Sequence, residues 1–377
     1  MIKPSDLITL SNHTFFDNDE GLITPDGHRV FNSTLVDYIQ AIQPATFVVD
    51  NNTALAEWVN NTAGNDYTHV LIKQGSFFIN KTIDLELTGT KTIVGMAGNK
   101  IRVAGETMVG VKGSNILNND CFIMGLNVEV TEGKGVIAFQ SCNHLLKCSG
   151  TIRCTSLDKF AAFYQCNYLS HCLAFCTSHG TGAYAYSGCK YLDNCYGYTQ
   201  TTTGHGSYCF DNCSSLNNCN GEATGVGSIA GFYKCLNLTN CYANATARNN
   251  GSGFLNCENL VNCTGISTTT GSAASYCFFH CYRLINCGGR GLNSGDAGGY
   301  SFCECRYLFG CYPYGTSKSE TYLSCYMSQS GTINPVADTA QGGYNMTLLN
   351  KTSDEITETN KPVIKDEQLK ENFDDTL

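Results

Sequence analysis

The ten residues FYQCNYLSHC, positions 163–172, contain a pattern that the chain repeats eight times. An aromatic residue, Phe163, is followed at three-residue intervals by Cys166, Leu169 and Cys172. The first cysteines of successive copies are 22 to 24 residues apart, and a ninth, degenerate copy keeps only an aromatic and one cysteine. A fixed period in this range is typical of a solenoid, in which each repeat is one rung that packs on its neighbours.

We number each position from the first cysteine of its copy, so that the aromatic is at −3, the leucine at +3 and the second cysteine at +6. The first cysteines are Cys142, Cys166, Cys189, Cys213, Cys235, Cys257, Cys281 and Cys305, and the ninth copy contains Tyr322 and Cys325. Side chains on a straight strand alternate between faces, so residues three apart cannot all point inward from one strand. Corners between short strands would restore the inward direction. The frame therefore predicts one aromatic, one leucine and two cysteine columns along the core.

Two further positions support stacked rungs. Position +5 is asparagine in five consecutive copies, and asparagine tolerates the left-handed backbone of tight turns: Asn194, Asn218, Asn240, Asn262 and Asn286. Position +8 is always small or proline, which suits a bend or a crowded interior: Gly150, Ala174, Gly197, Gly221, Ala243, Gly265, Gly289 and Pro313.

The chain contains 23 cysteines, of which the eight frames hold sixteen. Neighbouring rungs, about 4.8 Å apart, are close enough for disulfides, which leaves a disulfide ladder as one interpretation. The odd count and a reducing cytosol favour buried thiols, because cysteine packs as a small hydrophobic residue. A zinc site requires closely spaced Cys-x-x-Cys pairs, which the sequence lacks. We therefore expect no metal and no cofactor.

Composition narrows the class of protein. The 377 residues carry a net charge of −9, which argues against nucleic acid as a partner. No apolar run is long enough to cross a membrane, so we expect no membrane insertion. The N-terminus lacks the hydrophobic core of a signal peptide, which predicts that the chain folds in a cytosol.

The sequence divides into three predicted parts. Residues 1–44 carry no repeat and form a predicted attachment or leader segment. Residues 45–325 form the solenoid, with cysteine-rich rungs over 139–325, and residues 326–377 form a C-terminal cap and acidic tail. We predict a capping helix at the start of the solenoid, over Thr53–Asn60, with Asn52 or Thr53 as its N-cap and Trp58 as a packing residue.

The N-terminal part of the solenoid carries a resemblance to a known family. THVLIKQGSFFINKTIDLELTGTKTIVGMAGNKIRV, residues 68–103, contains short β-rich runs at 69–72, 76–79, 92–95 and 101–103. It resembles the opening rungs of right-handed parallel β-helices of the pectate-lyase-like kind. Such helices are common in phage tail spikes, in tail fibres and in secreted polysaccharide enzymes. The resemblance implies an all-β right-handed parallel β-helix over 45–325, and it brings no catalytic motif.

A second architecture also fits part of the pattern. Aromatic-x-x-Cys-x-x-Leu with a period near 23 is similar to the leucine-rich repeats of bacterial surface proteins. Those repeats continue with an aliphatic strand and a proline-containing turn, whereas small polar residues follow the frame here. The β-helix is the favoured interpretation.

Catalytic residues are unknown from the sequence. Polysaccharide-cleaving enzymes use paired carboxylates, but the acids of the repeats fall at different frame positions: Asp193 at +4, Asp211 at −2, Glu222 at +9, Glu258 at +1 and Glu304 at −1. Tyrosines form a clearer surface pattern. Aromatic side chains on a stiff scaffold bind sugars or protein loops at small entropic cost, although tyrosine also simply suits strands. The six candidate ligand-binding residues are Tyr168, Tyr191 and Tyr307 at +2, and Tyr196, Tyr242 and Tyr312 at +7.

These features lead to three functional hypotheses. The first is a phage virion protein, namely a homotrimeric tail spike, fibre or appendage that contacts other virion proteins and a host surface polysaccharide or receptor. The second is a polysaccharide lyase or glycoside hydrolase on the same scaffold. The third is a cell-surface adhesin, which requires an export route.

Overall fold

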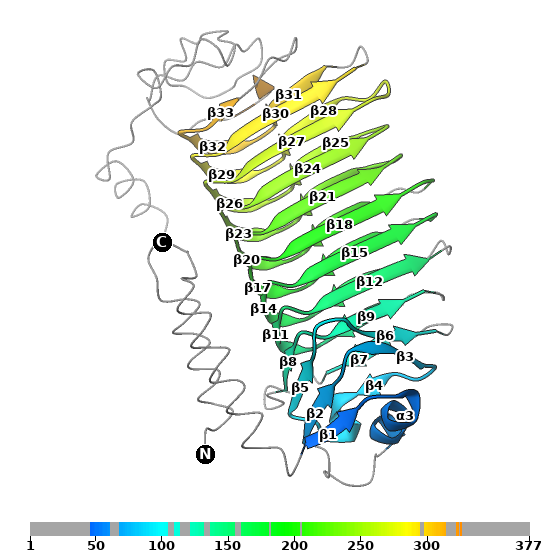
Figure 1. The fold of residues 1–377 in the computed structure, drawn as a ribbon. Helices are drawn as coiled ribbons and strands as arrows, with labels where there is room; N and C mark the ends of the chain where they lie inside the picture. The colour runs from blue at the N-terminus through cyan, green and yellow to red at the C-terminus, as the bar shows by residue number, and fades with distance from the viewer. Residues whose placement is uncertain are drawn as a thin grey trace, which may run out of the picture.

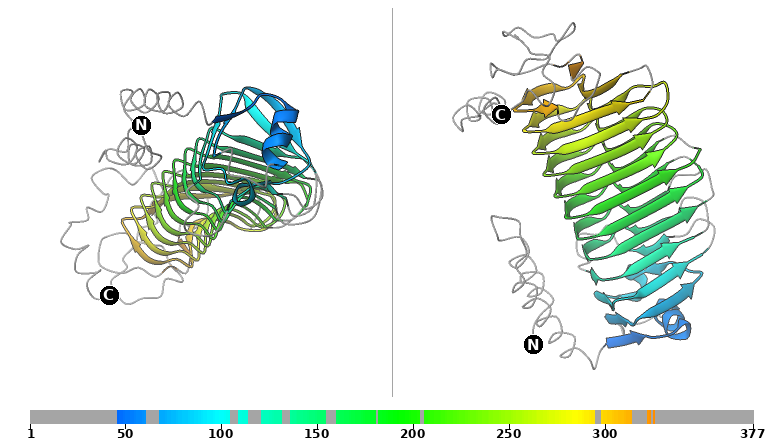
Figure 2. Two further views of the ribbon diagram at one scale, coloured as in Figure 1. Left: turned by 90° about the horizontal axis from the view of Figure 1, so that it is seen from below. Right: turned by 45° about the horizontal axis from the view of Figure 1, so that its top comes forward.

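A computed structural model describes residues 46–60, 68–104, 109–113, 121–131, 136–154, 160–180, 182–203, 206–294, 298–313, 322–323 and 325. Within them the chain winds into a parallel β-helix whose rungs stack along one axis (Figure 1). Three parallel sheets surround one core, and a view from below shows the rungs stacked behind one another (Figure 2). The predicted all-β solenoid is confirmed. The predicted segments 1–44 and 326–377 lie outside the described residues.

A complete rung gives one strand to each sheet. Sheet A contains β1 (Thr46–Val49), β2 (His69–Ile72), β5 (Thr92–Gly95), β8 (Phe122–Met124), β11 (Asn143–Leu146), β14 (Asn167–Ser170), β17 (Lys190–Asp193), β20 (Ser214–Asn217), β23 (Leu236–Thr239), β26 (Glu258–Val261), β29 (Tyr282–Ile285) and β32 (Arg306–Phe309). Sheet B contains β3 (Gly75–Ile79), β6 (Asn99–Val103), β9 (Asn127–Val130), β12 (Ser149–Cys154), β15 (Leu173–Ser178), β18 (Tyr196–Thr201), β21 (Asn220–Gly225), β24 (Tyr242–Ala247), β27 (Thr264–Thr269), β30 (Gly288–Asn293) and β33 (Tyr312–Pro313). Sheet C contains β4 (Ile83–Asp84), β7 (Val109–Lys112), β10 (Ile137–Gln140), β13 (Phe160–Tyr164), β16 (Ala183–Ser187), β19 (Ser207–Asp211), β22 (Ile229–Tyr233), β25 (Gly251–Leu255), β28 (Ser275–Phe279), β31 (Gly299–Cys303) and β34 (Tyr322–Leu323). A leucine-rich repeat has one strand and a helical segment per repeat, so the leucine-rich interpretation is wrong.

Left-handed backbone explains the three-residue spacing. In the rung of Cys166, the φ angles of Gln165, Tyr168 and His171 are 52°, 55° and 53°. The same positions, −1, +2 and +5, have positive φ in all eight frames, including the five predicted asparagines at +5. A left-handed residue at every third position turns the chain, and the residue that follows each turn points inward: Cys166, Leu169 and Cys172 are all buried.

The inward positions form the predicted columns. The eight aromatic rings at −3 stack along the core with neighbouring centroids 4.6–5.0 Å apart and planes within 10° of parallel. Position +8 is small because it faces this stack: a Cβ at Gly289 would lie 2.8 Å from the Phe278 ring. The space left by the aromatic stack therefore limits the size of the residue at +8.

The thiols of both cysteine columns also contact backbone carbonyl oxygens. The structure contains all 23 cysteines as thiols, and all are buried. The Cys166 thiol lies 3.5 Å from two carbonyl oxygens, those of Tyr164 and of Phe139 in the preceding rung. The second column repeats this contact, since Cys172 approaches the Leu145 carbonyl at 3.5 Å. A thiol thus combines a small apolar volume with a weak donor at each corner.

Helix α3 (Asn52–Asn60) packs at the N-terminal end of the β-helix (Figure 1). Leu55, Trp58 and Val59 are buried, and the Trp58 indole donates to the Thr90 hydroxyl at 2.9 Å. Trp58 is therefore the packing residue that the sequence predicts.

The cap of this helix differs from the prediction. The backbone N–H of Ala54 donates to the Asn51 side chain at 2.9 Å, so the N-cap is Asn51 and not Asn52 or Thr53. The helix begins one residue earlier than predicted, because an asparagine side chain already satisfies its first turn. A short helix, α4 (Leu85–Thr88), was not predicted; the Asp84 side chain caps it.

Candidate functional site

The six candidate tyrosines lie on two faces of the β-helix. Those at +2 lie on the outer side of sheet A, and those at +7 begin strands of sheet B. The structure therefore does not bring the six together, and each set has its own neighbours.

The +2 set forms a partial ladder. Tyr168 stacks between His144 and Tyr191, with ring centroids 5.0 and 4.8 Å away. Tyr168 and Tyr191 are 51% and 52% exposed. The neighbours cover both faces of the Tyr168 ring and leave only its edge and hydroxyl for a ligand. Because the apolar surface of a sugar packs best on the face of an aromatic ring, Tyr168 offers it little. Tyr307 is separate and contacts Tyr282 edge-on at 4.8 Å.

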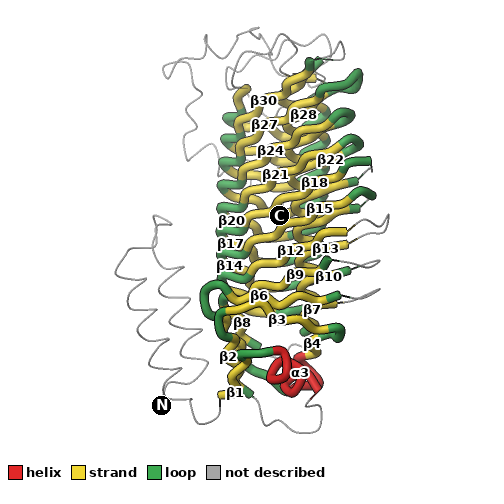
Figure 3. Tube along the Cα trace, turned by 45° about the vertical axis from the view of Figure 1, so that its right-hand side comes forward, coloured by secondary structure: helices red, strands yellow, loops and turns green. Residues whose placement is uncertain are grey.

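The +7 set contributes to a cluster on sheet B. Tyr196 pairs in register with Asn220, which pairs with Tyr242, while Tyr198 at +9 pairs with Glu222. Strands β18, β21 and β24 lie side by side (Figure 3). Residues two apart on a strand share a face, so both columns point outward. We call Tyr196, Tyr198, Glu222 and Tyr242 the tyrosine–glutamate cluster.

Glu222 links the tyrosines electrostatically. Burial raises the pKa of Tyr196, and a hydrogen bond from its hydroxyl to Glu222 raises it further. Burial and the negative charge of Glu222 also raise the pKa of Tyr242. Both hydroxyls therefore stay protonated and remain donors at neutral pH. Between these rungs, the side-chain oxygen of Asn220 is buried without a hydrogen-bond partner among the described residues.

Sequence reasoning missed the role of Glu222 and included Tyr312. No other acid of the repeats shares frame position +9 with Glu222, so a search for acid pairs does not find it. Its partners Tyr196 and Tyr242 are tyrosines at +7 in the two adjacent rungs. Pairing +7 with +9 across rungs would have found the cluster. Tyr312 lies three rungs beyond Tyr242, and its ring covers Gly288, whose Cβ would lie 2.9 Å from it.

A basic region lies nearer the N-terminal end of sheet B. The Glu129 carboxylate contacts Lys100 Nζ and Arg102 Nε at 3.2 Å each, and Arg153 Nε at 3.8 Å. Burial opposes ionisation of Glu129, but the hydrogen bonds and charges of Lys100 and Arg102 outweigh it and lower its pKa. Glu129 is therefore a fixed anion that pairs with Lys100 and Arg102, and Arg153 lies at the edge of this group.

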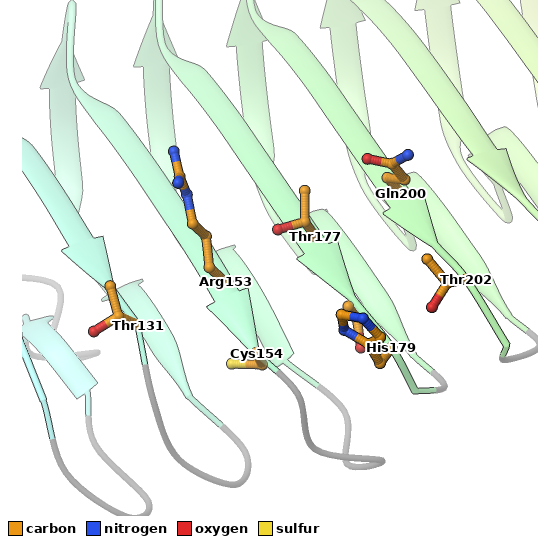
Figure 4. A pocket seen from close by; sticks show the side chains of 8 residues that line it. Thr131, Arg153, Cys154, Thr177, His179, Gln200 and Thr202 are labelled. Carbon is orange, nitrogen blue, oxygen red and sulfur yellow. The ribbon is translucent and has the colours of Figure 1, made fainter.

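Beside this region is an open pocket of about 440 Å³. Thr131, Arg153, Thr177 and Gln200 project into it from neighbouring rungs, and His179 and Thr202 lie near the strand ends (Figure 4). We call it the Arg153 pocket.

Sheet C also carries outward tyrosines, but these pack against one another. Tyr208 contacts Tyr184 at 6.0 Å and stacks on Tyr233 at 4.3 Å, and Lys234 lies over the Tyr233 ring at 5.0 Å. Burial is the main cause that raises the pKa of Tyr208 to about 12. Ring faces in this group are therefore already occupied.

Among the described residues, the carboxylates on the outer face of sheet B lie too far apart to form a catalytic pair. Glu129 and Glu222 are four rungs apart, because in-register pairing connects them through Thr151, Phe175 and Tyr198. At about 4.8 Å per rung the separation is roughly 19 Å, whereas two-carboxylate hydrolysis requires about 5–9.5 Å.

Within the described ranges, no group of three or more His, Cys, Asp or Glu side chains is arranged to hold a metal ion. Neither helix in this part of the chain has the length and apolar character of a membrane span. The sequence matches no protein-family model, and a comparison with curated proteins finds no similar chain.

Proposed function

We propose that the protein binds a surface polysaccharide through the outer face of sheet B. The observation that carries this proposal is the tyrosine–glutamate cluster, in which one carboxylate lies among three outward tyrosines on adjacent strands. Aromatic rings offer apolar surface to the C–H faces of sugar rings, while the carboxylate and phenolic hydroxyls bind sugar hydroxyl groups.

The scaffold supports this use. Sheet B has eleven strands within the described residues, and its strands are fixed by ladder hydrogen bonds and by the stacked core behind them. A backbone fixed in this way does not have to be ordered when a ligand binds, which favours affinity. An extended polymer chain can contact several rungs at once.

Binding is favoured over cleavage because the carboxylates of this face are too far apart to act as a pair. The pectate-lyase-like kind of β-helix, the phage tail spike or fibre, the virion partners and the homotrimer stay predictions from the sequence. They are compatible with a glycan-binding face on a rigid rod.

Replacing Tyr198 with alanine should weaken polysaccharide binding roughly tenfold or more, as expected for an aromatic residue at the centre of an interface. The probe is an array of defined bacterial surface oligosaccharides, and affinities of the bound members are then measured by surface plasmon resonance.

The matched control is Tyr184→Ala on sheet C, which removes the same ring from another face and should leave affinity unchanged. If the wild-type protein binds no glycan, or if the control loses as much affinity as Tyr198→Ala, the proposal is wrong. Thermal unfolding of both variants by circular dichroism separates binding losses from folding losses.

A further inference from the structure

We infer that the bound polysaccharide is anionic and that the Arg153 pocket binds its acidic group, a carboxylate, sulfate or phosphate. This inference rests on the proposed function, because it concerns the same outer face of sheet B. It adds the charge of the ligand and the place where that charge is recognised.

The first support is an excess of positive charge. Lys100, Arg102 and Arg153 share one carboxylate, that of Glu129, so two of the three positive charges are not balanced within the group. Their side chains are 42%, 52% and 68% exposed, against 8% for Glu129. The cations therefore face solvent, although the chain as a whole has a net charge of −9. An anion approaching this face meets a locally attractive potential.

The second support is the set of donors around Arg153. The contact of its Nε with Glu129 at 3.8 Å is longer than a hydrogen bond, and a guanidinium has further donors in a planar fork that matches oxyanions. The hydroxyls of Thr131 and Thr177 and the amide of Gln200 line the same pocket (Figure 4). Guanidinium, hydroxyl and amide groups together are suited to several oxygens of one anionic group.

The thiol in the pocket does not compete with this role. Cys154 also lines the pocket, and burial raises its pKa to about 11. The thiol is therefore protonated at neutral pH and is a poor nucleophile. The pocket is thus suited to reversible binding and not to covalent chemistry at this residue.

The third support is continuity with the tyrosine–glutamate cluster. Tyr198 and Gln200 lie two residues apart on β18, so their side chains share the outer face, and Gln200 lines the pocket. On the neighbouring strand β15, Phe175 and Thr177 are also two residues apart and share the outer face. The centroids of the Phe175 and Tyr198 rings are 6.4 Å apart. A glycan whose sugar ring packs on these aromatics can therefore extend its acidic substituent to Arg153 in the next rung.

The test compares neutral oligosaccharides with matched ones that carry a carboxylate, a sulfate or a phosphate. The full-length protein should bind acidic members more tightly than neutral members, and salt should weaken this preference. Arg153→Gln should reduce affinity for the acidic members roughly tenfold and leave affinity for the neutral members unchanged. Arg306→Gln, which removes the same charge from exposed strand β32 of sheet A, is the matched control and should bind like wild type.

Each failure has its own result. If neutral and acidic members bind equally and Arg153→Gln changes neither, this inference is wrong while the proposed function stands. If no member binds, the proposed function is wrong as well. If one acidic group alone depends on Arg153, that group identifies the anion and supports the inference.

Discussion

Replacing Phe232 with alanine should lower the free energy of unfolding by about 3–5 kcal/mol. The Phe232 ring is fully buried and stacks between Phe210 and Phe254, with centroids 4.6 and 4.9 Å away. The substitution removes both stacking contacts and opens a cavity. The cavity stays open because the backbone hydrogen bonds of the parallel sheets hold the neighbouring rungs in place. Urea unfolding followed by circular dichroism measures the change.

The control for this prediction is Tyr191→Ala, which removes a half-exposed ring of similar size from the +2 column. It should change the free energy of unfolding by less than about 1.5 kcal/mol, because it loses one stacked pair and leaves no buried cavity. Equal losses in the two variants would show that the −3 column is not the main source of rung stability.

The second large effect concerns the thiols. A small thiol reagent should leave all 23 cysteines unmodified in the native protein at neutral pH and modify all 23 after unfolding without reductant. Burial both blocks access and disfavours the reactive thiolate, as where it raises the pKa of Cys121 and Cys209 to about 12. Mass spectrometry counts the modified residues in each state.

Fewer than 23 modified cysteines after unfolding would reveal disulfides and would contradict the packing role of the columns. Reductant should restore the full count in that case. A native protein that reacts rapidly at many frame positions would contradict their burial.

The cysteine frame was sufficient to predict the core, because its side chains are fixed by their contacts with identical residues above and below. The −3 aromatics and the +8 glycines follow from the same steric constraint, and position +5 follows from the conformational tolerance of asparagine. What the frame did not reveal is that −1 and +2 are also left-handed. These positions often hold residues such as Gln165 or Tyr168, which have no preference for that conformation.

The candidate site was predicted only in part. Tyr196 and Tyr242 share a frame position and were found, but Glu222 joins them through contacts between different positions in adjacent rungs. The basic region was missed because Lys100, Arg102 and Glu129 lie where the cysteine frame is absent, so the sequence did not indicate that they pair with the rung of Arg153. The register of the strands brings these charged side chains together, and the composition of the sequence does not show that register.

The most direct test of a glycan-binding face on sheet B is hydroxyl-radical footprinting of the protein with and without a saturating oligosaccharide selected from the array. Tyr196, Tyr198 and Tyr242 on sheet B should lose reactivity when the glycan is bound, while Tyr184, Tyr208 and Tyr233 on sheet C should keep theirs. Protection of the sheet C tyrosines, or of Tyr168 and Tyr191 on sheet A, with no change on sheet B would contradict the account.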